Sequence, residues 1–538
     1  MPVINASQNL IEKFGFEAKE IANGIMHLGG EAKLENGEWF FEVGANRWDL
    51  FTPEGIMNAL LLFYGRKKPE KYVCESSGIV IDVEESVKEV RPYVVGALVE
   101  CSEINNEYIV HLMRIQEKFH ETIGRKRKKL AIGIHDFDKV APPFTYMGVA
   151  PETIAFEPLG FNEPMTLKEI LEKHPKGIEY AWILEGSTRY PVIVDTNGEV
   201  LSFPPVINGN LTEVTEETRN LFIDMTGTDL KTLKFALNVL VHSLALHGWK
   251  VKTVEIKGAE NLITPDFQWR KKKLQIKDVN SILGIELSID ACAALLTKMG
   301  YIVEPCEGAL NVDVPPYRCD VMHNVDLVED IAIAYGYDNI TEKLPVHLTI
   351  GKMDRKTEIE DAIRKYFIGL GAQEVCSFFL SSEEAQYSLL GIQPDKNNVV
   401  KAKNAKTREY SVARHTLISN MLKVIYTNQR FPLPLKFFEI GAVFDNGECH
   451  KVCYASVHAK ACFSEIKSVA ESFLKEFEVD YQIESGDLPY IIPGRCGKIV
   501  KNNKVIGVFG EIHPQILENF CVNYPAVVLE FEIESLFL

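Results

Sequence analysis

Two adjoining stretches carry the most specific pattern of the chain: residues 315–320 read PPYRCD, and residues 324–337 read NVDLVEDIAIAYGY. The second stretch predicts a helix, closed by its glycine, because glycine is common just after the last helical turn. Three and four residues separate Asp326, Glu329 and Asp330, so their carboxylates share one helix face while apolar side chains fill the opposite face. The pattern therefore predicts an amphipathic helix with an acidic stripe.

The acidic stripe offers oxygen ligands for a cation. Asp320 lies on the turn that leads into the predicted helix, upstream of the three carboxylates. A set of carboxylates without sulfur or imidazole ligands suits Mg²⁺ better than Zn²⁺. The alternative is that acidic residues simply favour the first turn of a helix and face water. The spacing alone leaves both interpretations open.

The bulk composition predicts a multidomain cytoplasmic protein. A chain of 538 residues with 46% apolar and 25% charged residues is too long for one hydrophobic core, and roughly three to five folded units are expected. Neither a membrane-spanning apolar stretch nor a signal-peptide pattern is apparent. The 11 scattered cysteines favour buried thiols in a reducing compartment over a disulfide framework.

The net charge of −17 indicates that any RNA contact is local, since phosphate binding needs a local excess of cations. The best basic run is residues 125–129, RKRKK, at the end of a helix with a regular apolar stripe. This run is either an RNA-binding patch or a complement to the negative helix C-terminus.

The order of helix and strand patterns predicts a multidomain α+β fold with four modules. They are an N-terminal α/β module at residues 1–85, a larger module at 86–265, a small helix-rich module at 272–345 and an α+β module at 346–538. Within this scheme, residues 181–184 are expected to form a strand and residues 270–273 to form a linker.

Two groups of polar residues in the second module are candidates for a site. Gly133, His135 and Asp136 lie where a strand is expected to enter a turn, and such a group could bind a water molecule or simply stabilise the turn. Asn208 and Asp224 are polar residues on otherwise apolar predicted strands. Neither group is specific by itself.

Taken together, the chain resembles the beta subunit of phenylalanyl-tRNA synthetase in its archaeal/eukaryotic form, over nearly its full length. The resemblance rests on stretches at residues 45–55, 130–146, 202–208, 222–229, 315–337, 409–417, 437–441 and 507–514. It implies a B3/B4-like editing module, a B5-like metal-bearing module and a C-terminal, degenerate class II synthetase-like antiparallel sheet with helices. The last lacks the Gly-x-Gly-x-Gly-x-x-Arg segment with which active class II enzymes hold ATP.

The resemblance implies a phenylalanine–tRNA ligase in which a separate alpha subunit activates the amino acid. It implies an alpha2beta2 tetramer that binds tRNA-Phe, with ATP mainly at the alpha subunit and no membrane association. It assigns Mg²⁺ coordination to Asp320, Asp326, Glu329 and Asp330. It also assigns an editing pocket that hydrolyses mischarged tyrosyl-tRNA to Ser202, Asn208 and Asp224, with weaker candidates Gly133, His135 and Asp136.

Two other functions stay open at this point. The chain could be a non-enzymatic RNA-binding or assembly scaffold that has lost editing, which the loss of hydrolysis of mischarged tRNA would indicate. It could also be a free-standing metal-dependent hydrolase built around Asp320, but such an enzyme needs an open cation with catalytic groups beside it. The motif offers few such neighbours, so a structural or interface cation is the preferred expectation.

Overall fold

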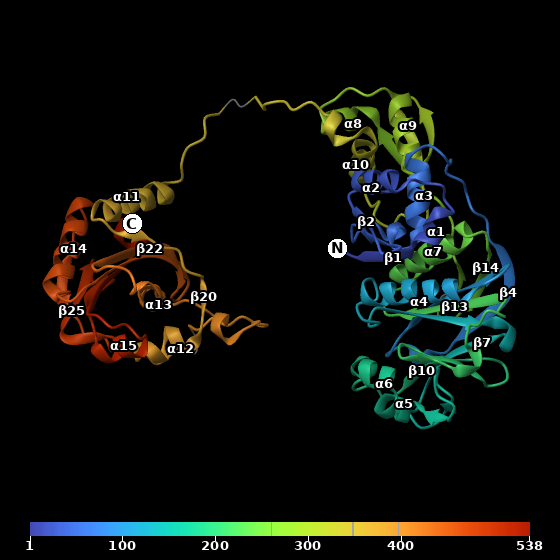
Figure 1. Ribbon diagram of the computed structural model, residues 1–538, viewed down its shortest axis with the longest axis horizontal. Helices are drawn as coiled ribbons and strands as arrows, with labels where there is room; N and C mark the ends of the chain where they lie inside the picture. Colours follow the sequence, from blue (N-terminus) through green and yellow to red (C-terminus); the bar gives the residue numbers. More distant parts are fainter. Residues whose placement is uncertain (260, 347–348, 396–397, 538) are drawn as a thin grey trace. The chain divides into compact units, whose positions relative to one another are not determined.

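The computed structural model describes residues 1–538 apart from 260, 347–348, 396–397 and 538. The chain divides into two compact units, Met1–Leu344 and Pro345–Leu538 (Figure 1). Both units combine sheets with helices, which confirms the predicted multidomain α+β fold.

The first unit opens with a small sheet in the order β1-β3-β2. Its elements are β1 (Val3–Ser7), α1 (Gln8–Glu12), α2 (Ala18–His27), β2 (Glu31–Glu35), β3 (Glu38–Glu42), η1 (Trp48–Leu50) and α3 (Pro53–Phe63). Helix α3 begins where sequence rules expect, because the Thr52 hydroxyl accepts the Gly55 N–H and Pro53 occupies the first turn.

A mixed ten-stranded sheet forms the middle of the first unit, with the order β12-β11-β10-β7-β4-β14-β5-β13-β6 and β15 beside β14. Its strands are β4 (Glu75–Val83), β5 (Tyr93–Glu100), β6 (Leu130–Asp136), β7 (Phe144–Val149), β10 (Tyr190–Val194), β11 (Val200–Phe203), β12 (Ile207–Asn208), β13 (Asn220–Gly227), β14 (Lys250–Lys257) and β15 (Leu262–Thr264). A separate pair joins β8 (Ala155–Phe156) to β9 (Met165–Thr166).

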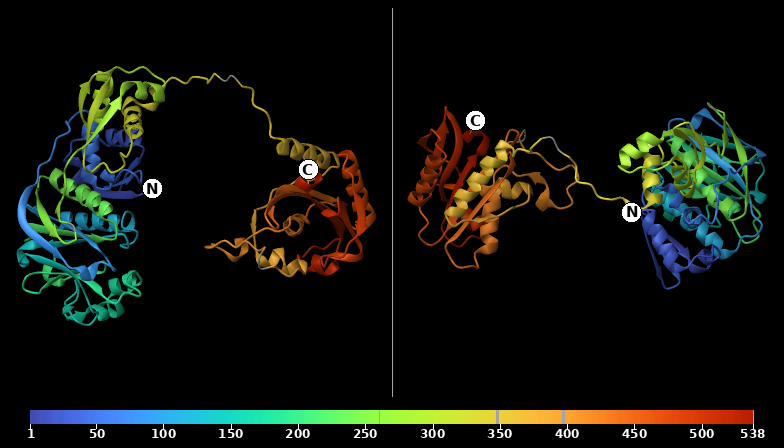
Figure 2. Two further views of the ribbon diagram at one scale, coloured as in Figure 1. Left: turned by 180° about the vertical axis from the view of Figure 1, so that it is seen from behind. Right: turned by 90° about the horizontal axis from the view of Figure 1, so that it is seen from above.

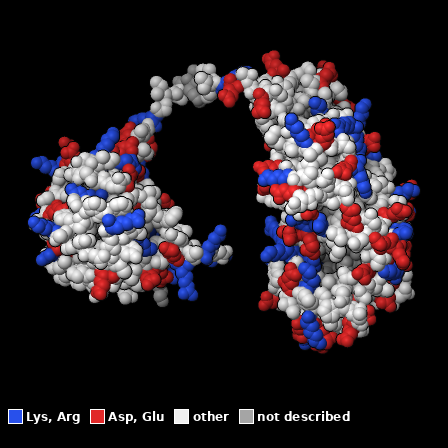
Figure 3. Space-filling view, viewed as in Figure 1, with Lys and Arg blue, Asp and Glu red and all other residues white. Residues whose placement is uncertain are grey.

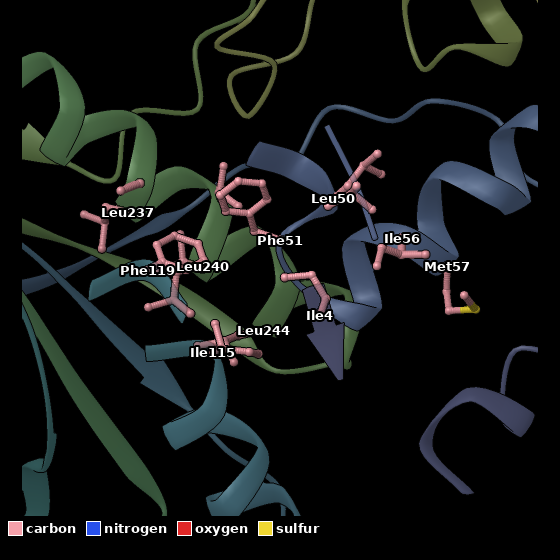
Figure 4. Packing of buried hydrophobic residues seen from close by; sticks show 14 of the residues in the cluster. Ile4, Leu50, Phe51, Ile56, Met57, Ile115, Phe119, Leu237, Leu240 and Leu244 are labelled. Atoms are coloured by element: carbon pink, nitrogen blue, oxygen red, sulfur yellow. The ribbon is translucent and has the colours of Figure 1, made fainter. Parts of the chain in front are cut away.

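Helices cover this sheet and join it to the N-terminal module. They are α4 (Asn106–Glu121), α5 (Leu167–Lys173), α6 (Pro175–Tyr180) and α7 (Leu230–Leu246), with 3-10 turns η2 (Glu85–Val87), η3 (Phe137–Lys139), η4 (Ala181–Ile183) and η5 (Asn210–Thr212). Figure 4 shows Phe51 of the N-terminal module beside Phe119 of α4 and Leu240 of α7. All three side chains are buried, so the two modules share one core.

The last part of the first unit is a three-stranded sheet packed against three helices. Its elements are β16 (Arg270–Gln275), α8 (Ile276–Leu283), α9 (Ile289–Lys298), β17 (Ile302–Cys306), β18 (Ala309–Val314), α10 (Asn324–Tyr335) and η6 (Tyr337–Asn339). Helix α10 runs over the acidic motif, as its periodicity predicts, and Gly336 follows it with φ 93°.

The second unit is built on a seven-stranded sheet in the order β19-β22-β23-β27-β26-β25-β24, antiparallel except for the β19–β22 pair. Its strands are β19 (Gln373–Glu374), β22 (Leu435–Phe444), β23 (Glu448–Val457), β24 (Gln482–Ser485), β25 (Ile491–Lys501), β26 (Lys504–Ile512) and β27 (Ala526–Glu532), with β20 (Leu380–Ser381) and β21 (Val412–Ala413) as a separate pair.

Helices pack on both faces of this sheet. They are α11 (Arg355–Gly369), α12 (Glu383–Gln386), α13 (Ile418–Asn428), α14 (Phe463–Glu476), α15 (Pro514–Asn519) and α16 (Ile533–Phe537), with 3-10 turns η7 (Ser388–Leu390) and η8 (Arg408–Tyr410). Helices α11 and α14 share a core with one face, and α13 and α15 share a core with the other, which the views in Figure 2 let the reader follow. Alternate residues of each strand therefore serve different cores.

The structure corrects two local predictions. Residues 181–183 form the 3-10 turn η4 and not a strand, because the apolar run directly continues helix α6. Residues 270–273 form the start of β16 and not a linker, since their backbone pairs with β18 while the Arg270 guanidinium donates to the carbonyl of Val321. Helix α8 follows at once and was not predicted.

The surface carries no strongly single-signed face in the direction that Figure 3 shows, where cationic and anionic side chains alternate over both units. None of the described helices is both long and apolar enough to cross a membrane.

Candidate functional site

A cavity of about 270 Å³ lies beside the large sheet in the first unit. Strands β6 and β13 form one wall, helix α4 together with Arg127 forms a second, and residues 202–209 form a third. The lining is mostly apolar, with contributions from Leu112, Ile132 and Phe203. An apolar cavity with a few polar groups is the usual form of a small-molecule site.

Two polar groups in this lining have hydrogen-bonding capacity left over. The hydroxyl of Ser202, which is 2% exposed, has no hydrogen-bond partner among the described residues. Asp224 is equally buried, and its only hydrogen bond within the described part of the chain uses Oδ2. Unpaired buried polar groups are costly, so both groups favour a ligand that can bond to them.

The hydrogen-bond partner of Asp224 is His135, which is fully buried and is not part of the cavity lining. Its Nε2 is 2.8 Å from Oδ2 of Asp224, and its Nδ1 is 2.8 Å from the Thr212 hydroxyl. The imidazole therefore holds the carboxylate in place from the side away from the cavity. Strand pairing brings these residues together, because Asp224 of β13 faces Gly133 of β6.

Gly133 is required by this arrangement. A Cβ atom added at Gly133 would overlap Oδ2 of Asp224 and lie 2.5 Å from Nε2 of His135. No other residue type leaves room for the hydrogen bond between His135 and Asp224, so the role of the glycine is steric.

The remaining predicted pocket residues lie in different places. Asn208 lines the cavity, and its amide is 3.4 Å from the carbonyl of Ile134. Asp136 does not line the cavity: its carboxylate accepts from the Thr218 hydroxyl at 2.9 Å and from the backbone N–H of Asp138 at 3.2 Å. Its position is that of a turn-stabilising residue, which is the alternative that the sequence left open.

Sequence reasoning missed other polar lining residues, among them Gln116, Glu117, His120 and Arg127. Arg127 belongs to the basic run, but its guanidinium is buried, ion-paired with Glu117 and bonded to the carbonyl of Val206 at 2.9 Å. Burial lowers the pKa of His120 to about 4, so its imidazole is neutral at neutral pH. The ring accepts the Ile132 N–H at Nε2, which places its proton on Nδ1.

The four acidic residues predicted to bind Mg²⁺ line a second hollow, of about 570 Å³, in the same unit. Glu329 is exposed, and Asp326 accepts the backbone N–H groups of Met322 and His323 at the start of α10. Asp330, by contrast, is only 4% exposed. The structure therefore brings the four residues to one hollow but gives them unequal surroundings.

An arginine already compensates two of these carboxylates. The buried guanidinium of Arg318 is 2.7 Å from both Asp320 and Asp330, and Tyr301 donates to Asp330 as well. The Arg318 and Arg47 charges lower the pKa of Asp320 against the opposing effect of burial. Among the described residues, no three acidic, histidine or cysteine side chains converge on a common metal position. As folded here, the four carboxylates do not form a ready-made metal site.

In the second unit, a buried polar network lies on the sheet where β22 meets the residues that precede α13. Arg414 and Glu439 form an ion pair at 2.5 Å, and Ser377 donates to the same carboxylate at 2.7 Å. A Cβ added at Gly441 would overlap the Arg414 guanidinium, so the strand backbone closes over it. The polar groups here are satisfied by one another.

Comparisons with known proteins agree across the whole chain. Residues 106–244 match the family described as the B3/4 domain, residues 272–337 match the tRNA synthetase B5 domain, and residues 340–533 match the phenylalanyl tRNA synthetase beta chain CLM domain. The large cavity lies within the first of these matches, and the acidic hollow takes its four carboxylates from the second.

Relatives and a solved structure are similar over long ranges. The phenylalanine–tRNA ligase beta subunit of Archaeoglobus fulgidus is 37% identical over 100% of this chain and 99% of its own length, and that of Thermococcus kodakarensis is 37% identical over 94% and 92%. An N-terminal fragment of the phenylalanyl-tRNA synthetase beta subunit from Pyrococcus horikoshii is 36% identical, with a TM-score of 0.60 over 62% of this chain and 100% of that fragment. The chain therefore belongs to the family of phenylalanine–tRNA ligase beta subunits.

Proposed function

We propose that this chain serves phenylalanine–tRNA ligation as the non-activating partner of an alpha subunit, and that the cavity beside β13 removes tyrosine wrongly attached to tRNA-Phe. The observation that carries the editing proposal is an apolar cavity with two polar groups in its lining: the unpartnered Ser202 Oγ, and Asp224, whose Oδ1 accepts no hydrogen bond from the described residues. The cavity lies in the B3/4 match.

The physical basis of selection is the phenolic hydroxyl. A tyrosine ring can fill the apolar part of the cavity while its hydroxyl donates to Asp224 and exchanges a hydrogen bond with Ser202. A phenylalanine ring would leave both groups buried and unpaired. A site built to hydrogen-bond a hydroxyl rejects the analogue without it strongly, by about 10⁴–10⁵-fold in favourable cases.

Hydrolysis in this cavity would use water directly. Ser202 is an unsuitable nucleophile, because no imidazole or amine lies within hydrogen-bond distance of its hydroxyl. The polar groups of the lining include Asn208, Gln116 and the Glu117–Arg127 pair. We assign to them the positioning of the ester and of the attacking water.

Activation of phenylalanine is assigned to the alpha subunit, with which we propose that this chain forms an alpha2beta2 tetramer. The Arg414–Glu439–Ser377 network supports this assignment. Its polar side chains bond to one another, which leaves them less available to bind a nucleotide. ATP would then bind the complex mainly at the alpha subunit, and tRNA-Phe would bind both chains.

We propose that the acidic hollow at the start of α10 binds Mg²⁺ only if one of its ion pairs opens or another chain supplies a ligand. Asp326 and Glu329 are the two carboxylates without an arginine partner, so a bound Mg²⁺ would need Arg318 to release Asp320 or Asp330, or a ligand from another chain. Magnesium titration of the complex, followed by melting temperature, tests this proposal. A rise that Glu329→Gln abolishes would support it, and the same rise in both proteins would exclude this position.

Deacylation of tyrosyl-tRNA-Phe tests the editing proposal. The complex with Asn208→Ala or Asp224→Ala should lose hydrolysis by about 100-fold or more while retaining phenylalanine charging. Unchanged hydrolysis in both variants would remove the cavity from editing. A wild-type complex that leaves tyrosyl-tRNA intact would instead identify a scaffold that has lost editing.

A further inference from the structure

Arg91, between η2 and β5, is a buried cation that the cavity does not contact directly. It is 2% exposed, and no carboxylate lies within ion-pair distance of it among the described residues. Burial lowers its pKa to about 10, so it remains charged at neutral pH. A buried charge of this kind is costly unless it is fully hydrogen-bonded.

The hydrogen bonds of Arg91 go to the backs of two cavity walls. Its Nε donates to the Thr226 hydroxyl at 2.8 Å, and Nη2 donates to the Thr226 carbonyl at 2.7 Å. Its other contacts are the carbonyls of Arg127, at 3.1 Å, and Lys128, at 3.2 Å. Thr226 and Arg127 both line the cavity.

One of these carbonyls, that of Arg127, belongs to a strained segment, and Lys128 follows this segment directly. Arg125, Lys126 and Arg127 have φ angles of 49°, 55° and 65°, so three successive residues with side chains occupy the left-handed region. Each such residue is unfavourable relative to ordinary backbone, and strain of this kind persists only where the surroundings enforce it. The segment turns the Arg127 side chain into the cavity wall, where it contacts Glu117 and the carbonyl of Val206.

We propose that Arg91 is a positioning residue for the editing reaction, acting through Thr226 and the left-handed segment 125–127. This inference rests on the proposed function of the cavity. The planar guanidinium reaches β13 and the segment at the same time, which fixes the spacing of two walls that are distant in sequence. The Tyr146 hydroxyl donates to the carbonyl of Arg91 at 2.8 Å and so fixes the arginine itself.

The guanidinium of Arg91 has several N–H donors in one plane, so its hydrogen bonds can be removed by a substitution that keeps the positive charge. A lysine at position 91 would keep the positive charge but would not span acceptors on both walls, because its ammonium is a single point donor. We therefore expect Arg91→Lys to lose hydrolysis nearly as much as Arg91→Met. The loss should be 10- to 100-fold, mainly in kcat, with a small change in KM.

The experiment uses the full complex and tyrosyl-tRNA-Phe in single-turnover and steady-state hydrolysis. Leu244→Ala is the matched control, because it makes a cavity in the buried core of the same unit without contacting the editing cavity. It should lower the melting temperature while leaving the hydrolysis rate within 3-fold of wild type. Phenylalanine charging, measured in parallel, reports whether each complex is assembled.

A second variant separates positioning from general stability. Glycine adopts left-handed backbone without strain, so Lys126→Gly should restore several-fold of the activity lost in Arg91→Lys. Leu244→Ala should gain nothing from the same change. If Arg91→Lys hydrolysed tyrosyl-tRNA at the wild-type rate while Arg91→Met did not, the positive charge alone would be sufficient, and the inference would be overturned. Absence of hydrolysis in the wild-type complex would instead overturn the proposed function.

Discussion

Replacing Gly133 by alanine is the most informative single change in the cavity. The added methyl group would overlap Oδ2 of Asp224 and approach Nε2 of His135 to 2.5 Å, and Cγ of Asp224 to 3.0 Å. Both neighbours are buried, and strand pairing fixes the backbone on which each stands. The hydrogen bond between His135 and Asp224 must therefore break.

The expected cost follows from two effects. Loss of a buried hydrogen bond to a charged group costs about 1.5–3 kcal/mol, and overpacking adds about 1–3 kcal/mol. We expect the free energy of unfolding of the first unit to fall by about 2.5–6 kcal/mol. A displaced Asp224 should also lower tyrosyl-tRNA hydrolysis by about 100-fold.

Denaturant unfolding and deacylation assays measure both effects. Gly369→Ala is the matched control, because its Cβ would meet nothing within 4 Å and its position ends helix α11. It should be neutral or slightly stabilising. If Gly133→Ala unfolded within about 0.5 kcal/mol of wild type and hydrolysed tyrosyl-tRNA normally, the steric role of the glycine would be refuted.

Three further predictions concern buried titratable and paired groups. The folded-state pKa of Glu54 lies below the ordinary 4.5, because its bonds to His111 and Ser243 outweigh burial; its stabilisation is therefore present above pH 4.5 and lost below it. Melting curves of Glu54→Gln should lie below wild type at pH 7 and converge with it as pH falls. His120, with a pKa of about 4 against 6.5 when unfolded, should contribute stability above pH 6.5 that disappears between pH 6.5 and 4, and His120→Gln should flatten that part of the stability profile; an unchanged slope would contradict this. Removing Arg414 leaves Glu439 buried without its cation, so Arg414→Ala should destabilise the second unit by about 3–5 kcal/mol in urea unfolding, and equal midpoints would show that the pair is not needed.

Much of the fold could be predicted because local patterns agree with tertiary packing. The helix at residues 324–335 is an example, since its apolar stripe, its acidic first turn and the following glycine indicate one element. Where the local sequence pattern was ambiguous, pairing with a distant strand determined the secondary structure. The basic stretch at 270–273 becomes a strand because β18 supplies a backbone partner, which no local pattern reveals.

The candidate site was only partly predictable for the same reason. Ser202, Asn208 and Asp224 were expected from family resemblance, and strand pairing explains why Asp224 meets Gly133 and His135. Glu117 and Arg127 carry no sequence signal for the cavity. Glu117 reaches it from helix α4, and Arg127 reaches it from the left-handed segment that follows this helix.

The acidic motif shows the limit of helical periodicity. Spacing places Asp326, Glu329 and Asp330 on one helix face, and the family resemblance assigned all three to a cation. Burial against Tyr301 and Arg318 separates their roles, because a neighbouring element supplies the compensating charge. Whether Mg²⁺ binds there remains a prediction.

Binding of two non-hydrolysable ligands tests the central claim about the cavity most directly. Adenosine carrying tyrosine through a 3′-amide, and its phenylalanine counterpart, would be titrated calorimetrically into the full complex with the alpha-subunit site blocked. The unpartnered Ser202 Oγ and the Asp224 carboxylate, whose Oδ1 accepts no hydrogen bond from the described residues, predict that the tyrosyl ligand binds at least about 100-fold more tightly. Asp224→Ala should remove the difference. Equal affinities in the wild-type complex would contradict the account.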